Sequence, residues 1–226
     1  MSTADTSLPP AAEHNPVEVV LETARGPVHA LYHAMPGSST ALLAVGGGDG
    51  GFEGPANGLY PDLATLLAAR GTATLRLDFR IHQFPNIVEE AVADVQAGIA
   101  FLVVEGVRRI ALVGHSFGGA VVIDAAIDEP LVVGVATMAT QTAGAQRVGL
   151  LAPRPILLVH GLEDIRLLPE CSRLLYARAG EPKRLVLLEG ATHSLRQAGE
   201  EVRQLLSDWL FDTLADATAG ARLGGE

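Results

Sequence analysis

The chain has 226 residues, of which 48% are hydrophobic and 19% charged, a balance typical of a packed globular protein and not of a disordered one. Its apolar runs are short, such as the run from Leu131 to Ala139, and none approaches the roughly 18 residues of a membrane span. The formal net charge of −10 gives a surface that repels phosphate groups. Membrane spanning is therefore excluded, and no nucleic-acid partner is expected.

The termini and the single cysteine bear on location and metal binding. The first sixteen residues have neither a basic segment nor an apolar segment of the kind that a secretion signal needs. Cys171 has no second cysteine with which to form an internal disulfide, and no cluster of Cys and His has metal-ligand spacing. We therefore expect a cytoplasmic protein, a monomer or a homodimer, without a metal site.

The organisation of the chain predicts one domain. Residues 1–16 are polar and contain proline, and residues 215–226 are rich in Ala and Gly, so both ends are expected to be flexible tails. The intervening residues 17–214 contain no linker or internal repeat.

Eight short β-type runs alternate with longer helical patterns in this domain. Several are continuously apolar, as expected of central parallel strands buried on both faces, whereas the first two alternate as an antiparallel edge hairpin would. The alternation predicts a doubly wound α/β sheet. The expected strands are Val17–Glu22, Pro27–His33, Ala41–Gly46, Ala73–Phe79, Arg109–Gly114, Val132–Ala139, Ile156–His160 and Arg184–Leu188.

Helix signals separate these runs. Pro61 suits a first helical position and Gly71 a C-terminal stop. Asn86, with Glu89 three residues later, predicts a capping box. Two apolar stripes then follow helical periodicity. They consist of Val88, Val92, Val95, Ile99 and Leu102, and near the C-terminus of Val202, Leu205, Leu206, Trp209, Leu210 and Thr213.

The sharpest chemical signal is the sequence Gly-His-Ser-Phe-Gly-Gly at residues 114–119, between an apolar strand and a helical run. Glycines two residues before and two after Ser116 permit a very tight strand-to-helix turn. Such a turn presents the serine hydroxyl, so Ser116 is a candidate nucleophile. The alternative is a glycine turn with a purely structural role.

A serine nucleophile needs a base, and the base needs an acid to orient it. Two later loops leave the carboxyl edge of the predicted sheet, where open α/β sheets place their sites. One holds Glu163 and Asp164, either of which could be the acid, and the other holds His193. His193 is the favoured base, although it could be an ordinary surface histidine. His160, at a strand end, is expected to be structural.

The order Ser116, Asp164, His193, each in the loop after its own strand, resembles the α/β-hydrolase fold over roughly Val17 to Leu214. The short chain is similar to the dienelactone-hydrolase-like and small carboxylesterase group. The resemblance implies a catalytic triad, and its spacing favours Asp164 over Glu163 as the acid. Dienelactone hydrolases proper carry cysteine at the position of Ser116, so their substrate is not implied.

An oxyanion hole needs two preorganised donors. The first is expected to be the backbone N–H of Phe117. The second should lie in the glycine-rich loop at residues 46–51, with Gly48 the better candidate and Gly47 the alternative; relatives often have His-Gly where this chain has Gly46-Gly47. A phosphate cradle is disfavoured because the loop lacks a Gly-Lys-Ser/Thr ending.

Charged residues near this edge of the sheet give weaker indications. Asp49 and Glu53 predict a negatively charged mouth, which disfavours strongly anionic substrates. Arg80 and His82 could contact substrate, but pairing of Arg80 with Asp78 is the favoured alternative.

These features together predict a serine esterase for small acyl esters that needs no cofactor. Only residues 140–154 separate two strands where relatives insert a lid, so we expect no cap domain and an open site shaped by residues 46–57 and 81–86. A thioesterase or amidase would use the same triad. A non-catalytic binding protein, or a lyase or acyltransferase, is a more distant alternative.

Overall fold

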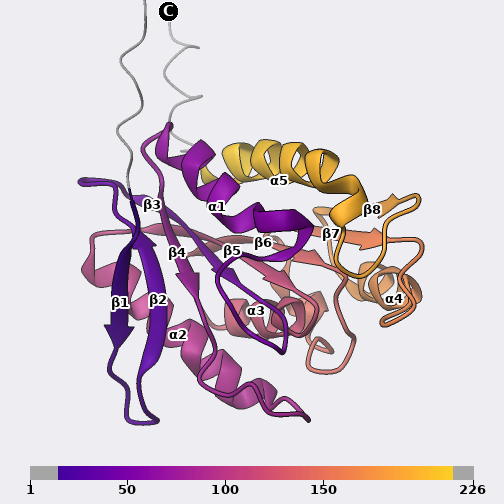
Figure 1. The fold of residues 1–226 in the computed structure, drawn as a ribbon, viewed down its shortest axis with the longest axis horizontal. Helices are drawn as coiled ribbons and strands as arrows, with labels where there is room; N and C mark the ends of the chain where they lie inside the picture. The colour runs from indigo at the N-terminus through magenta and orange to yellow at the C-terminus, as the bar shows by residue number, and fades with distance from the viewer. Residues whose placement is uncertain (1–14, 216–226) are drawn as a thin grey trace, which may run out of the picture.

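The computed structural model describes residues 15–215, and within them the chain folds around one eight-stranded sheet of order β1-β2-β4-β3-β5-β6-β7-β8 (Figure 1). β1 and β2 form an antiparallel hairpin, β2 is antiparallel to β4, and all other neighbours are parallel. The sheet therefore confirms the predicted topology. The strands are β1 (Val17–Leu21), β2 (Val28–His33), β3 (Thr40–Val45), β4 (Ala73–Leu77), β5 (Arg109–His115), β6 (Val132–Met138), β7 (Ile156–Gly161) and β8 (Lys183–Leu188).

Helices cover both faces of the sheet (Figure 1). α1 (Pro55–Ala68) and α5 (Gly199–Leu214) lie on one face, and α2 (Val88–Val104), α3 (Phe117–Ile127) and α4 (Glu170–Arg178) on the other. Two short 3₁₀ helices are η1 (Val148–Leu151) and η2 (Arg196–Ala198).

The continuous apolar runs of the strands are explained by this double covering. In β3, Leu42 packs in the core beneath α1 and α5, whereas Leu43 packs in the core beneath α2 and α3. Both side chains are fully buried, and each such burial contributes roughly 1.5–3 kcal/mol. A strand with one wet face would have alternated instead.

The start of α1 differs from the prediction. Pro61 lies inside α1 and not at its first position, because Ala56, Asn57 and Gly58 have positive φ and interrupt the helix before its regular part. Pro61 is tolerated there because the first N–H groups of a helix have no intrahelical acceptor. The predicted stop is confirmed: Gly71 has φ +73° just beyond the helix end.

The predicted capping box of α2 is wrong. Ile87 is the N-cap residue and no side chain caps the helix. Asn86 instead donates its side-chain N–H to the carbonyl O of Gly48, 3.3 Å away. A tertiary contact has therefore replaced the local one that the spacing indicated.

No cap domain interrupts the described residues. Between β6 and β7 the chain forms only turns and η1, as expected. Residues 1–14 and 216–226 of the expected tails lie outside the described residues. No helix in residues 15–215 is both long and apolar enough to span a membrane.

Candidate active site

Ser116 stands at the turn between β5 and α3, in a conformation rare for a residue with a side chain. Its φ is 55° and its ψ −116°, and its N–H donates to the carbonyl O of Met138 at 2.8 Å. A Cβ at Gly114 would lie 2.3 Å from the carbonyl O of Gly118, and one at Gly118 only 2.1 Å from that of Gly46. Both glycines are thus required for the turn to close.

Three side chains predicted from separate loops are joined by hydrogen bonds. His193 Nδ1 lies 2.7 Å from Asp164 Oδ2, and His193 Nε2 lies 3.0 Å from Ser116 Oγ. Because an ionised carboxylate only accepts, Nδ1 carries the proton towards Asp164. In the neutral imidazole, Nε2 then has a free lone pair and accepts from the Ser116 hydroxyl.

Asp164 is buried and fully engaged. Its other oxygen, Oδ1, accepts from the backbone N–H groups of Arg166 and Leu167 at 2.9 and 3.0 Å. Burial acts to raise its pKa, but the hydrogen bonds from Leu167 and His193 outweigh burial and hold the pKa of Asp164 below its usual value. The neighbouring Glu163 is exposed.

His115 lies beside this group of residues. Its ring centroid is 4.9 Å from that of His193, and its Nε2–H donates to the backbone carbonyl O of His193 at 3.0 Å. Burial lowers the pKa of His115 to about 4. A neutral His115 therefore connects the turn at Ser116 with the loop that carries His193.

The predicted oxyanion-hole residues lie on either side of Ser116. Phe117 begins α3 and packs edge-to-face on Phe79, with ring centroids 5.5 Å apart. Across from it, a Cβ at Gly47 would lie 3.5 Å from Ser116 Cβ, whereas one at Gly48 would collide with the side chain of Asn86. Gly47 therefore faces the serine, and Gly48 is held against Asn86.

Side chains from β4 and the segment after it hold the glycine-rich loop in place. Asp78 Oδ1 accepts from the Gly51 N–H at 2.7 Å and also contacts His82 Nε2 at 2.9 Å. Arg76, almost fully buried, donates to the carbonyl O of Phe52 at 3.2 Å. His82 thus supports the loop through Asp78, and it does not line the cavity.

Arg80 is engaged elsewhere. It forms ion pairs with Asp94 and Glu90 on α2 and donates to the carbonyl O of Arg25. The predicted pairing of Arg80 with Asp78 is therefore wrong, because the fold brings two carboxylates of α2 closer than the sequence neighbour. Arg80 also lies outside the cavity lining.

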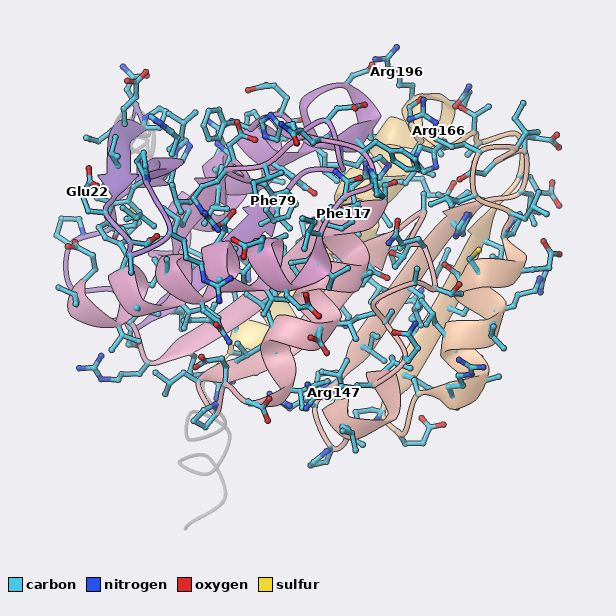
Figure 2. The ribbon with its side chains drawn as sticks, turned by 90° about the horizontal axis from the view of Figure 1, so that it is seen from below. Glu22, Phe79, Phe117, Arg147, Arg166 and Arg196 are labelled. Carbon is cyan, nitrogen blue, oxygen red and sulfur yellow. The ribbon has the colours of Figure 1, made fainter. Side chains whose placement is uncertain are left out.

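A cavity of about 610 Å³ opens above Ser116. It is lined as expected by the loop of residues 46–58, but not by residues 81–86. Asp49 and Glu53 are part of the lining, and so are Arg166 and Arg196. Figure 2 shows the two arginines near each other at the end of the molecule opposite Arg147.

The charge of the mouth differs from expectation. Glu53 forms an ion pair with Arg76 at 3.2 Å. Within residues 15–215, the guanidinium groups of Arg166 and Arg196 have no hydrogen-bond or ion-pair partner. The mouth therefore carries both signs of charge, so its charge does not disfavour anionic substrates. In the same part of the chain, no group of three acidic, His or Cys side chains could hold a metal ion.

Sequence comparison assigns the family. Residues 41–222 match the family model described as alpha/beta hydrolase family. The chain belongs to this family. No curated protein matches the chain in sequence.

Solved structures of the same fold are numerous, and the alpha/beta hydrolase chain superposes on several of them over most of its length. Est1E from Butyrivibrio proteoclasticus has a TM-score of 0.73 at 18% identity, covering 88% of this chain and 99% of that one. Dienelactone hydrolase from Anabaena variabilis has a TM-score of 0.72 at 20% identity, covering 89% and 100%. An α/β serine hydrolase without a lid, from Xanthomonas campestris, has a TM-score of 0.70 at 18% identity, covering 90% and 97%.

Some residues of the site were not anticipated. Arg166 follows Asp164 by two residues and Arg196 follows His193 by three, and this closeness in sequence is the signal that could have placed them at the cavity. Ser172, a buried serine on α4 that contacts His160, carries no such signal, because only the packing of α4 brings it near.

Proposed function

We propose that this alpha/beta hydrolase is a serine hydrolase that cleaves small acyl esters of carboxylic acids. The observation that carries the proposal is the unbroken hydrogen-bond chain from Ser116 through His193 to Asp164, which ends at the cavity. Est1E, dienelactone hydrolase and the lidless serine hydrolase, to which the chain is similar in fold, support this chemistry.

In the proposed mechanism, His193 Nε2 takes the hydroxyl proton as Ser116 Oγ attacks the ester carbonyl. Asp164 keeps His193 in the tautomer that leaves Nε2 free, and it stabilises the imidazolium that forms. The imidazolium then protonates the leaving alcohol, and an acyl-enzyme remains on Ser116. Water, activated by the same nitrogen, releases the acid.

The oxyanion of each tetrahedral intermediate is proposed to bind the backbone N–H of Phe117 and that of Gly48. Gly47, which faces Ser116, is the alternative second donor. Each such donor typically contributes about 10²–10³ in rate. The fixed glycine-rich loop supplies this preorganisation.

An ester panel tests the proposal. Wild type should hydrolyse short-chain esters, and Ser116→Ala should lose at least roughly 10³-fold in kcat. Ser194→Ala is a matched control, because Ser194 also lines the cavity but is not the partner of His193 Nε2. Full activity of Ser116→Ala would overturn the mechanism.

A thioesterase or an amidase would use the same residues. Matched thioester and amide substrates, included in the panel, separate these activities by their kcat/KM ratios. A folded protein that turns over no substrate and is not labelled at Ser116 by a fluorophosphonate would instead indicate a binding protein.

A further inference from the structure

A second histidine, His160, approaches the same carboxylate oxygen of Asp164 as His193 does. His160 lies near the end of β7 and is fully buried. Its Nε2 is 3.2 Å from Asp164 Oδ2 and 2.9 Å from the carbonyl O of Leu167. Its Nδ1 is 2.7 Å from Oγ of Ser172, which is also fully buried.

These contacts fix the tautomer of His160. The Leu167 carbonyl can only accept, so Nε2 must carry a proton. Burial lowers the pKa of His160, which favours the neutral ring. Nδ1 is then an acceptor and receives a hydrogen bond from the Ser172 hydroxyl. This bond keeps the proton of His160 on Nε2, which faces the Leu167 carbonyl and Asp164.

Asp164 Oδ2 therefore accepts a hydrogen bond from His193 at 2.7 Å and also lies 3.2 Å from the protonated Nε2 of His160. Together with the N–H groups of Arg166 and Leu167 on Oδ1, they leave the carboxylate little freedom to rotate. A carboxylate with the N–H dipole of His160 3.2 Å away is a weaker base towards His193 than one without it.

We propose that His160, oriented by Ser172, is a positioning residue that sets the direction and basicity of the Asp164 carboxylate for His193. The proposal rests on the proposed function, because it assigns His160 a role in the same reaction. The series of polar contacts thus has five side chains, running from Ser172 through His160, Asp164 and His193 to Ser116.

The other charged and titratable groups around this series are few. Burial raises the pKa of the Cys171 thiol, next to Ser172 on α4, and the negative charge of Asp164 raises it further. The charge of Glu170 also raises the pKa of Cys171, and the charge of Arg166 lowers the pKa of His115. None of these groups is changed in the variants below, so a change in the pH profile reports on His160.

The test compares three variants by the pH dependence of kcat/KM on a short-chain aryl ester. His160→Leu removes the N–H donor, and His160→Gln keeps an amide N–H near the position of Nε2. Ser172→Ala leaves Nδ1 without its donor. Ser207→Ala is the matched control, since Ser207 is a buried serine on α5 that donates to the carbonyl O of Gln204.

His160→Leu should lower kcat roughly tenfold, the lower end of what loss of an outer hydrogen-bond partner costs at metal sites. It should also move the acid limb of kcat/KM to higher pH by about half a unit, because the freed carboxylate stabilises the imidazolium more strongly. His160→Gln should restore most of kcat and the wild-type limb. Ser172→Ala should shift the limb in the same direction as His160→Leu, and Ser207→Ala should leave it in place.

The outcomes separate this inference from the proposed function. If Ser116→Ala is inactive while His160→Leu keeps the wild-type acid limb and kcat, the positioning role is wrong and the triad stands. If His160→Leu does not fold, Ser172→Ala decides, and a profile identical to that of Ser207→Ala overturns the role. If Ser116→Ala is fully active, both proposals fail.

Discussion

Ser116 has an unfavourable backbone conformation, with a positive φ. A positive φ at a residue with a Cβ costs on the order of 1–3 kcal/mol, and here the N–H bond to Met138 and the close contacts of Gly114 and Gly118 hold it in place. That geometry is what directs the hydroxyl towards His193. The motif around Ser116 made this conformation predictable from the sequence.

His115 gives a prediction at the same scale. The unfolded chain binds a proton at His115 near pH 6.5, whereas burial delays protonation of the folded protein to about pH 4. The contribution of neutral His115 to folding stability is therefore fully present above pH 6.5 and is lost as the pH falls towards 4. This contribution falls by about 2–3 kcal/mol by pH 4.5.

Denaturant unfolding at pH 7 and pH 4.5 measures this effect. His115→Gln should lose clearly less stability between the two pH values than wild type does. His82→Gln is the control, because His82 is much more exposed. An equal loss in wild type and His115→Gln would show that the protonation of His115 is not coupled to folding.

Single residues also show where sequence reasoning stops. The order and spacing of Ser116, Asp164 and His193 placed them in loops that the structure brings together. The partners of Arg80 and of Asn86 were mispredicted because both are tertiary. The sequence alone indicated only partners close by in the chain, whereas in the fold residues distant in sequence lie nearer to Arg80 and Asn86.

At the scale of elements, β5, α3 and the glycine-rich loop form one interlocked unit. α3 begins so close to the loop that Gly118 has room for no side chain beside the carbonyl O of Gly46. The position of Ser116 and that of the loop are therefore coupled through backbone contact.

Gly118→Ala tests this coupling. A methyl group 2.1 Å from the carbonyl O of Gly46 must push α3 and the loop apart. We expect a loss of about 1–3 kcal/mol in unfolding free energy and a fall in kcat of roughly 10²-fold, as for loss of one oxyanion donor. Thermal unfolding and ester turnover measure the two effects.

Gly199→Ala, at the start of α5, is the matched control. A Cβ at Gly199 would lie 3.3 Å from its nearest neighbour, the carbonyl O of Ala56. It should leave kcat unchanged. If Gly118→Ala turns over ester at the wild-type rate, the loop and Ser116 are not coupled in this way.

Elements were predicted best where burial governs them. The parallel strands were found because each packs on two apolar layers, and continuous apolar runs mark that environment. Helix starts were found less well. The positive φ values of Ala56, Asn57 and Gly58 accompany a bond from the Ala56 N–H to the carbonyl O of Ser194, a contact that no local pattern encodes.

At the scale of the whole molecule, most of residues 15–215 belong to the sheet and its covering helices, and the rest form the connections between them. With only turns and η1 between β6 and β7, the cavity is covered by no lid within residues 15–215. Its walls are the glycine-rich loop and the loops that carry Asp164 and His193. The negative net charge of the chain is therefore not concentrated at the cavity. Its lining includes two basic residues, Arg166 and Arg196, as well as Asp49 and Glu53.

The central claim is that Ser116 is an activated nucleophile, and active-site labelling by a fluorophosphonate tests it most directly. Intact-mass measurement of the folded protein should show one adduct per chain, and peptide mapping should place it on Ser116. Ser194→Ala should label as wild type does, and Ser116→Ala should not label at all. A folded wild-type protein that stays unlabelled, or an adduct retained in Ser116→Ala, would contradict the account.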